Sequence, residues 1–335
     1  MKSIFLVGGG TAGSVMPLLA IAEHLVGVQI YFIGTRLGVE SKLIPATISY
    51  LTLPAGKLRR YFAWQNFIDP VKIFAAFFKS LYLLLRYQPK VVVSAGSFVA
   101  TPMIWAAWCS GVAIVVHQQD LQVSLTTKLT APFATVLTKA FQAIPLRGAD
   151  WIGNPVRNLT PTTNILKLDP SVLTVFIFGG GTGAQALNNL VTAQLCHHAN
   201  VIHVTGSGKN PHSINHARYH QFELLHEEYK EALAKADIVV ARAGLGTMSE
   251  LAVLGKPAII IPIPHSHQEY NASFLKQHDA ALILDQTTLT PELFTQAIKT
   301  LLVDTDRQKQ LAQHIQLLIK PQAAEILANK INDLI

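Results

Sequence analysis

The sequence predicts an α/β protein with two Rossmann-like domains that face each other across a cleft. Two observations support this fold class. Short apolar runs alternate with helical patterns along most of the 335 residues, as in a doubly wound parallel sheet. The alternation also starts twice with strand, glycine-rich turn and helix, as "SIFLVGGGTAGSVMPLLAIAEHL" from Ser3 and "LTVFIFGGGTGAQALNNLV" from Leu173. Ligands of such sheets bind beyond the carboxyl ends of the strands.

The strands of the first half follow from its apolar runs. No residue between Val91 and Gln119 carries a formal charge, and this length could span a bilayer. Glycine and proline divide the stretch, however, which favours two buried strands around a helix at 100–110. The expected strands are 3–8, 28–34, 91–94, 113–117 and 136–138.

A change of composition marks the domain boundary. The stretch "GNPVRNLTPTTNILKLDP" is rich in proline, threonine and asparagine and lacks a long apolar period. We therefore predict a first domain at 1–154, a linker at 155–170, a second domain at 171–318, and a C-terminal helix at 319–335 that packs back toward the first domain. Further strands are expected at 201–205, 238–241, 258–263 and 281–284.

Composition limits the class of protein. Half of the residues are hydrophobic and 14% are charged, which favours sizeable buried cores over disorder. The formal charge of +7 favours anionic partners such as nucleotides, phosphate or an anionic membrane, and the absence of a lysine/arginine block argues against nucleic acid. Two cysteines cannot form a disulfide framework, so a reducing compartment fits. The apolar run before Gly8 is too short for a signal peptide.

The first glycine turn has the spacing of a dinucleotide site, since Gly8, Gly10 and Gly13 satisfy G-x-G-x-x-G. Such a site also needs an acidic residue at the end of the second strand to hold the ribose. That strand ends in "YFIGTRLGVE", where Glu40 comes too late, so a nicotinamide cofactor is disfavoured. Neither turn is a Walker A motif. Both still precede helix N-termini, which suit an anion.

The stretch from Ala236 to Leu275 predicts strand, glycine turn, helix, strand, polar loop and helix. Glu250 follows Thr247 by three residues, which indicates either a helix capping box or a carboxylate that holds two vicinal ribose hydroxyls. Arg242 fits either a buried ion pair or a phosphate or base contact. The expected polar loop carries Gln268 and Glu269.

Five motifs in order resemble the MurG family of glycosyltransferase family 28, nearly end to end. They are "GGGTAGSVMPLLAIAEHL", "SAGSFVATPMIWAAWCSGVAIVVHQQD", "GNPVR", "GGGTGAQALN" and "RAGLGTMSELAVLGKPAIIIPIPHSHQEYNA". The resemblance implies the GT-B fold. It also implies an inverting enzyme that moves N-acetylglucosamine (GlcNAc) from UDP-GlcNAc to undecaprenyl-diphospho-MurNAc-pentapeptide, at the cytoplasmic face of the cell membrane. No Asp-x-Asp motif is visible, so no metal is expected.

The resemblance also implies roles for single residues. Glu250 would bind the ribose hydroxyls of UDP, and Gln268 and Glu269 would touch GlcNAc. The diphosphate would lie against Thr247 and the turn of Gly181, Thr182 and Gly183, with Arg157 assisting. The first turn and the end of the strand at 113–117 would face the acceptor. The remaining donor contacts would be Thr11, Ala12, Gly13 and Arg242, and the acceptor contacts Gly10, Ser14, Gln119 and Asp120.

The sequence departs from the family pattern mainly on the acceptor side. Ser14 replaces the histidine that ends the first turn, and the family's His-Glu-Gln-Asn appears as His117-Gln118-Gln119-Asp120. Because this change places a carboxylate where the family has an amide, we hypothesise that Asp120 is the general base, with His117 in reserve.

The segment "GKLRRYFAWQNFIDPVKIFAAFFKSLYLLLRYQPK" combines basic and aromatic residues, which suits the surface of an anionic leaflet. We predict that the helix body at 70–86 faces the core. The residues expected to face lipid are Arg59, Arg60, Tyr61, Phe62 and Trp64.

Three alternatives remain open at this point. One is a related GT-B transferase with a different lipid acceptor. Another is a UDP-GlcNAc 2-epimerase, which shares the two-domain fold and has no need of the basic aromatic segment. The third is a non-catalytic sugar-nucleotide binder, in a complex with other cell-wall synthesis proteins.

Overall fold

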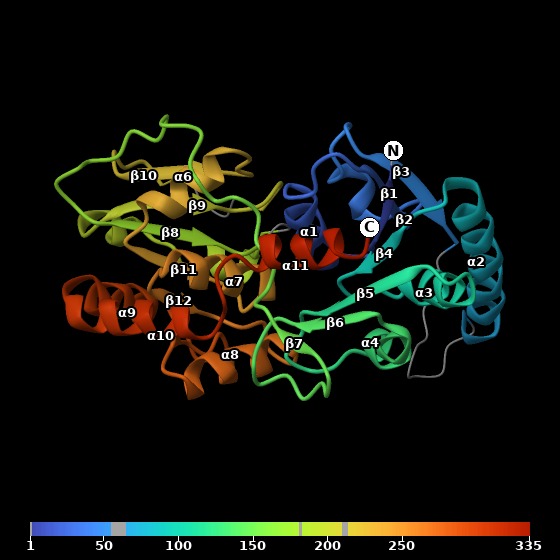
Figure 1. Ribbon diagram of the computed structural model, residues 1–335. Coiled ribbons are helices and arrows are strands. Elements are labelled where there is room, and N and C mark those ends of the chain that lie inside the picture. Colours follow the sequence, from blue (N-terminus) through green and yellow to red (C-terminus); the bar gives the residue numbers. More distant parts are fainter. Residues whose placement is uncertain (1, 55–64, 181–182, 210–213) are drawn as a thin grey trace. The chain divides into compact units, whose positions relative to one another are not determined.

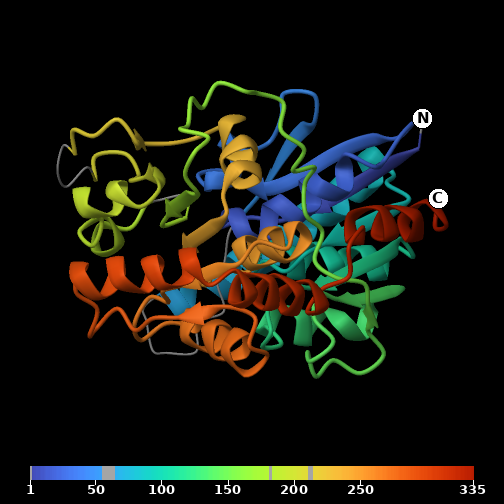
Figure 2. The ribbon, with the colours of Figure 1, turned by 90° about the vertical axis from the view of Figure 1, so that its left-hand side faces the viewer.

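The computed structural model describes residues 2–54, 65–180, 183–209 and 214–335. The chain forms two compact units, the first made of 1–158 with 319–335 and the second of 159–318. Each unit contains one parallel sheet, with helices on both sides of its strands (Figure 1 and Figure 2). The expected membrane-facing residues from Arg59 to Trp64, and Gly181 and Thr182 of the second turn, lie outside the described residues.

All the strands predicted in the first half form, with ends shifted by a residue or two. The sheet order is β3-β2-β1-β4-β5-β6-β7 and every pairing is parallel. Two edge strands, β3 and β7, were not predicted because neither is a continuous buried apolar run. The strands are β1 Ser3–Val7, β2 Gln29–Thr35, β3 Ser49–Leu53, β4 Val91–Ser94, β5 Ala113–Gln118, β6 Val136–Lys139 and β7 Asp150–Trp151.

Alternate side chains of β1 build two cores in the first unit. Ile4 and Leu6 pack with helices α1 and α11, whereas Phe5 and Val7 pack with α2 and α3. Side chains alternate across a strand, so a sheet covered on both faces needs apolar residues at every position. The helices of this unit are α1 Ala12–Ala22, α2 Gln65–Tyr87, α3 Ala100–Cys109, α4 Leu125–Thr130 and α11 Ala323–Asn332, with short 3₁₀ turns at Val39–Lys42 and Ala131–Phe133.

The sheet of the second unit has the same topology. Its order, β10-β9-β8-β11-β12-β13, matches the order of the first six strands of unit one. In such a sheet the strand order reverses at the centre, here between β8 and β11, and ligands bind at the carboxyl ends there. The strands are β8 Thr174–Phe178, β9 Asn200–Val204, β10 Tyr219–Phe222, β11 Ile238–Ala241, β12 Ala258–Ile260 and β13 Leu282–Ile283.

Helices cover both faces of this second sheet. Val175 and Ile177 of β8 belong to one core with Phe294 of α9, while Phe176 and Phe178 contact the ring of Tyr229 on α6. The helices are α5 Gln185–Asn188, α6 Glu228–Lys235, α7 Leu245–Leu254, α8 His267–Gln277, α9 Pro291–Val303 and α10 Thr305–Leu317, with a 3₁₀ turn at Ala193–His197.

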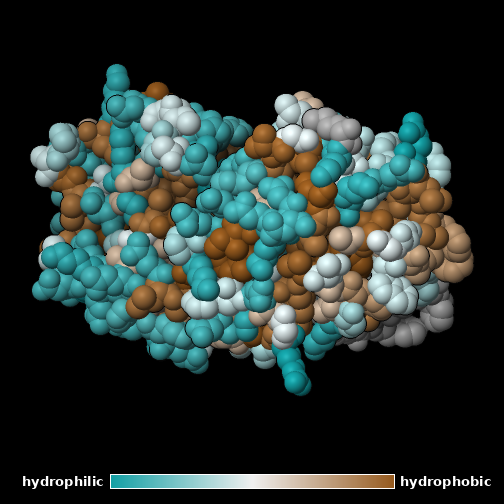
Figure 3. Space-filling model, in the orientation of Figure 1, coloured by the Kyte–Doolittle hydropathy of each residue, from teal (hydrophilic) through white to brown (hydrophobic). Residues whose placement is uncertain are grey.

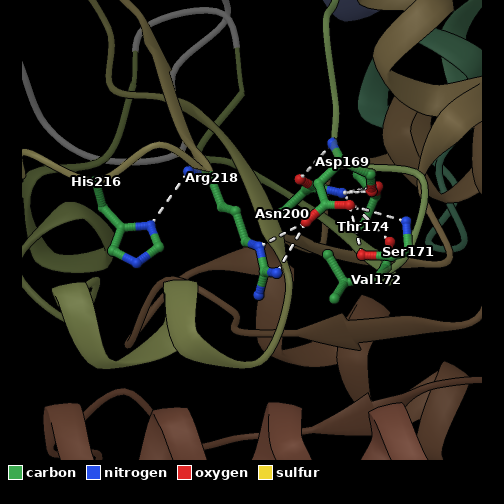
Figure 4. Close-up of polar contacts among 7 residues, drawn as sticks. All are labelled: Asp169, Ser171, Val172, Thr174, Asn200, His216 and Arg218. Atoms are coloured by element: carbon green, nitrogen blue, oxygen red, sulfur yellow. Dashed lines mark hydrogen bonds and ion pairs between the residues drawn. The ribbon is translucent and has the colours of Figure 1, made fainter.

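A polar cluster around Asp169 holds the end of the predicted linker, 155–170, against the second sheet (Figure 4). Asp169 accepts a hydrogen bond from Arg218 Nε at 3.0 Å and exchanges backbone bonds with the Asn200 side chain at 3.0 and 2.8 Å. Thr174 and Asn200 begin β8 and β9, so the cluster lies at the amino ends of the strands. It is therefore at the edge opposite to the one where ligands bind.

The buried carboxylate of Glu231 binds the middle of the same linker. Glu231 on α6 is 1% exposed and accepts hydrogen bonds from Thr163 Oγ1 at 2.8 Å, Ile165 N at 3.0 Å, Leu166 N at 2.9 Å and Lys235 Nζ at 2.7 Å. Burial alone raises the pKa of Glu231, but these hydrogen bonds outweigh it and hold the pKa at about 2. The ionised form is therefore the one that the fold stabilises.

We expect Glu231→Gln to lower the free energy of unfolding by about 2 to 3 kcal/mol at pH 7, since it weakens bonds to a buried charge. A folded-state pKa of about 2, below the 4.5 of a free glutamate, gives stability that is present above pH 4.5 and lost as pH falls toward 2. The cost of the substitution should therefore shrink in urea denaturation at pH 3. The exposed Glu227→Gln is the control, expected within about 0.5 kcal/mol. Equal costs of Glu231→Gln at both pH values would contradict the assignment.

Candidate functional site

The second glycine turn follows β8 at the centre of its sheet. Gly180 and Gly183 have positive φ angles of 90° and 68°, and a Cβ on Gly183 would overlap the Thr205 carbonyl, so only glycine fits there. The Gly183 amide donates to the Gly180 carbonyl at 3.0 Å. This amide closes the turn, and its predicted contact with a diphosphate stays a prediction.

The segment after β9 supports this turn. The Asn188 amide donates to the carbonyls of Thr205 and Lys209, both at 2.9 Å, and its oxygen lies 3.1 Å from His203 Nε2. Burial lowers the pKa of His203 to about 4, so the ring is neutral at pH 7. Lys209 Nζ lies 3.3 Å from the Gly183 carbonyl. This cation beside the turn was not predicted, although the glycines of "GSGK" after a strand could have indicated it.

Glu250 lies in the middle of α7, which begins after Gly244 at the carboxyl end of β11. Thr247 is the third residue of the helix and not its cap, so the capping-box interpretation is wrong. Glu250 Oε2 instead accepts a hydrogen bond from the Tyr229 hydroxyl at 2.7 Å. The half-buried carboxylate is held by a side chain of α6, and the helix backbone does not need it as a cap.

Arg242 braces the carboxyl ends of neighbouring strands. It is 6% exposed, and its Nη1 donates to the Ile261 carbonyl at 2.9 Å and its Nη2 to Gln286 Oε1 at 2.6 Å. Burial lowers the pKa of its guanidinium. Two of its three nitrogens are used inside the unit, which argues against both the predicted donor contact and a buried ion pair.

Gln268 and Glu269 lie in the first turn of α8, not in a loop as predicted. Ser266 caps this helix by accepting from the Gln268 amide at 3.2 Å, and Glu269 is exposed. Asn271 is buried and donates to the Ala243 carbonyl at 2.9 Å, just before α7. The N-terminal turns of α7 and α8 therefore lie together, and they bring Thr247, Glu250, Gln268 and Glu269 to one edge of the sheet.

In the first unit, an internal carboxylate fills part of the first glycine turn. Glu40 is fully buried and accepts from the Gly10 amide at 3.0 Å, the Thr35 amide at 2.7 Å and the Thr35 hydroxyl at 2.6 Å. Burial raises the pKa of Glu40, but the hydrogen bonds from Thr35 and Gly10 outweigh it and leave the pKa below that of a free glutamate. The Gly10 amide thus has an internal partner, and its predicted contact with the acceptor stays a prediction.

Ser14 is turned into the same turn and is 9% exposed. Its hydroxyl lies 3.2 Å from the carbonyls of both Gly9 and Thr11 and accepts from the Gly9 amide at 3.3 Å. It stabilises the turn, which argues against the acceptor contact predicted for it. Thr11, Ala12 and Gly13 remain exposed at the N-terminus of α1.

The second N-terminal motif meets this turn. The Ser97 hydroxyl donates to the Gly9 carbonyl at 3.0 Å, and the Gln119 side chain is buried and donates to the Ala95 carbonyl. The carboxyl ends of β1, β4 and β5 are therefore linked by side-chain hydrogen bonds. Gln119 takes part in this link through its side-chain amide, and its predicted contact with the acceptor substrate stays a prediction.

The two candidate bases differ sharply in exposure. His117 is fully buried between Thr138 Oγ1 at 2.9 Å and Asn154 Oδ1 at 3.4 Å, and burial lowers its pKa to about 4. Both ring nitrogens have partners inside the unit and the ring is buried, so the structure favours Asp120 over His117 as the base, and both roles stay predictions. Asp120 is exposed, and the Gln118 amide fixes its backbone carbonyl at 2.7 Å. Arg157 lies half-buried near the end of unit one.

Two family models match the chain in order. Residues 4–138 match the glycosyltransferase family 28 N-terminal domain and residues 174–327 match its C-terminal domain. A Clostridium kluyveri protein is 32% identical and covers 100% of this chain and 99% of its own length. It is a UDP-N-acetylglucosamine–N-acetylmuramyl-(pentapeptide) pyrophosphoryl-undecaprenol N-acetylglucosamine transferase. The crystal structure of Acinetobacter baumannii MurG has a TM-score of 0.77 at 25% identity, covering 99% of this chain and 100% of that one.

The chain belongs to the MurG family of glycosyltransferases. Each of its two units has the Rossmann-like topology predicted from the sequence, as in the GT-B fold. A UDP-N-acetylglucosamine 2-epimerase also resembles it, with a TM-score of 0.67 over 98% of this chain and 95% of that one, but at 13% identity this likeness concerns the fold alone. Within this MurG-family chain the described residues contain no group of three or more His, Cys, Asp or Glu arranged to hold a metal ion.

Proposed function

We propose that this protein transfers GlcNAc from UDP-GlcNAc to undecaprenyl-diphospho-MurNAc-pentapeptide, with inversion at the anomeric carbon, in peptidoglycan synthesis. The observation that carries the proposal is the match to the C. kluyveri transferase over the full length of both chains. A match of one half would support only donor or only acceptor binding. Both halves match here, and each places polar side chains at the carboxyl edge of its sheet.

On the donor side, Glu250 accepts hydrogen bonds from the two ribose hydroxyls of UDP, which a carboxylate can do while it also accepts from Tyr229. Negative charge develops on UDP as the glycosidic bond breaks. In the second unit, the N-terminus of α7 near Thr247 and the Lys209 ammonium beside the second turn are suited to stabilise that charge. The assisting role of Arg157, a residue of the first unit, rests on the family resemblance alone. The chemistry requires no metal ion in this scheme.

On the acceptor side, an acceptor hydroxyl attacks the anomeric carbon from the face opposite UDP. Asp120 takes its proton, because it is the exposed carboxylate at the end of β5 and His117 is buried. Thr11, Ala12 and Gly13, which were also predicted as donor contacts, form an exposed backbone at the start of α1 that suits a diphosphate of either substrate. The Gly10 amide supports this geometry by donating to Glu40.

A membrane-docking face lies on α2, which we call the α2 stripe. Five apolar residues of α2 are each more than half exposed: Val71, Phe74, Phe78, Tyr82 and Leu85. Brown and tan side chains follow the edge of the molecule where α2 lies (Figure 3). The prediction that the helix body faces the core is therefore only half right. Ala76, Ser80, Leu83 and Leu84 are buried, and the opposite side is exposed.

Basic residues accompany this stripe. Lys72, Lys79 and Arg86 recur every seven residues and are exposed on the same helix. An apolar face edged by cations suits the surface of an anionic leaflet. None of the helices in the described parts of the chain is long and apolar enough to cross a bilayer. We propose a peripheral position on the cytoplasmic face of the cell membrane, because the α2 stripe and its basic residues suit an anionic leaflet and a lipid-linked acceptor would be there.

Phe74→Ser combined with Phe78→Ser should weaken binding to vesicles that contain anionic lipid by about tenfold or more, because two large apolar side chains no longer enter the interface. Co-sedimentation measures this binding. The control pair is Val303→Ser with Leu317→Ser, which are 82% and 75% exposed on the second unit. Equal vesicle binding by both pairs would rule out the α2 stripe as the docking face.

The proposed reaction is tested by UDP release from UDP-GlcNAc with EDTA present, with and without a short-chain lipid I analogue. Release that requires the analogue and yields a disaccharide supports the transferase. Release or epimerised sugar without any acceptor would favour a UDP-GlcNAc 2-epimerase. Donor binding with no turnover would favour a different lipid acceptor or a non-catalytic sugar-nucleotide binder.

A further inference from the structure

The hydroxyl of Tyr229 is an unexplained part of the donor half. It donates to Glu250 Oε2 at 2.7 Å, across 21 residues of chain. Tyr229 is the second residue of α6, whereas Glu250 belongs to α7, so two separate helices meet at this bond. Nothing in the sequence pattern around Glu250 indicated a partner on α6.

The Tyr229 ring is fixed independently of this bond. It packs edge-on against Phe176 and Phe178 of β8, with ring centroids 5.7 and 5.5 Å apart and interplanar angles of 67° and 83°. The ring centroids of Phe176 and Phe178 also lie 4.7 Å apart. Since β8 is a central strand of the sheet, the hydroxyl is anchored to the rigid part of the unit.

We infer that Tyr229 is a positioning residue of the donor site, which holds the Glu250 carboxylate in the orientation that accepts the ribose hydroxyls of a uridine diphosphate. The inference rests on the proposed function. A glutamate has three rotatable side-chain bonds, and ordering them on binding weakens affinity. Because two aromatic rings hold the Tyr229 hydroxyl in place, this hydroxyl orders the Glu250 side chain before the nucleotide binds. The Glu250 carboxylate still has lone pairs that can accept hydrogen bonds from the ribose.

The test uses the full-length protein and calorimetric affinities for UDP and 2′-deoxy-UDP. Tyr229→Phe keeps the ring packing and removes only the hydroxyl. We expect its Kd for UDP to rise about 3- to 10-fold, with a smaller rise for 2′-deoxy-UDP, because Glu250 has fewer ribose hydroxyls to bind there. The KM for UDP-GlcNAc should rise with kcat nearly unchanged.

Two further variants isolate the path through Glu250. In a Glu250→Gln background, adding Tyr229→Phe should change the UDP affinity little, because the two residues act as one unit. The matched control is Tyr87→Phe, which removes the hydroxyl of a tyrosine whose ring packs against Phe5 and Tyr31 in the first unit. It should bind UDP as the unchanged protein does.

Several results would overturn the inference. Unchanged affinity in Tyr229→Phe would do so, and tighter UDP binding would mean that the hydroxyl competes with the ribose. Equal losses for both nucleotides, repeated in the Glu250→Gln background, would indicate general loosening of the unit. If the unchanged protein does not bind UDP, or if Glu250→Gln binds it normally, the proposed donor site itself fails and the inference fails with it.

Discussion

Glu250→Ala is expected to lower kcat/KM for UDP-GlcNAc by about 10²- to 10³-fold. The variant removes a charged acceptor for two ribose hydroxyls, each bond being worth about 1.5 to 3 kcal/mol. The ribose does not react, so most of the loss should appear in KM and in the Kd for UDP. Steady-state kinetics with a lipid I analogue measure both parameters.

The control for this prediction is Glu292→Ala, an exposed glutamate at the start of α9. It should leave kcat/KM within about twofold, as is usual for surface substitutions. Glu250→Ala should lower the free energy of unfolding by only about 1 kcal/mol, because the Tyr229 hydroxyl loses its partner while the cap of α7 at Gly244 is unaffected. A large loss of stability with normal KM would mean that the carboxylate is structural.

Asp120→Asn is expected to lower kcat by about 10²-fold, the usual contribution of a general base. The variant restores the amide of the family pattern and keeps the shape of the side chain, so binding should change less than turnover. The fall of kcat at low pH that a required base produces should also disappear. Rates across pH, with donor and acceptor saturating, measure this effect.

Two companions sharpen the result. Asp120→Glu keeps a carboxylate and should retain more activity than Asp120→Asn. Asp306→Asn, 96% exposed at its side chain on α10, is the matched control. If Asp120→Asn turns over as fast as the unchanged protein, Asp120 is not the base, and the amide suffices as it does in the family pattern.

The sequence predicted the central strands of each sheet better than the edge strands. The central strands are buried on both faces and therefore read as continuous apolar runs, as at Val91–Ser94 and Ile238–Ala241. Strands β3 and β10 are mostly half-exposed and lack such a run. Helix α2 was misjudged for a related reason. Apolar residues occur on all sides of this helix, so the sequence does not show which side packs in the core and which side is exposed.

The sites were predictable where one motif supplies the chemistry and less so where distant residues meet. Glu250 and Asp120 follow from local motifs. Glu40 reaches Gly10 from 30 residues away and Tyr229 reaches Glu250 from 21 residues away, so spacing within either motif could not reveal them. The burial of His117 was also not predictable, because sequence alone does not distinguish a buried imidazole from an accessible one.

The position of α11 has a consequence for biosynthesis. Leu327, Ala328 and Ile331 belong to the core that α1 forms on one face of the first sheet. Residues 159–318, in contrast, form a continuous unit. During translation the second unit can therefore complete its core before α11 is synthesised, while the first unit keeps one apolar face covered only in part, by α1, until α11 emerges. The N-terminal half of the chain is the last to mature, the reverse of the usual order.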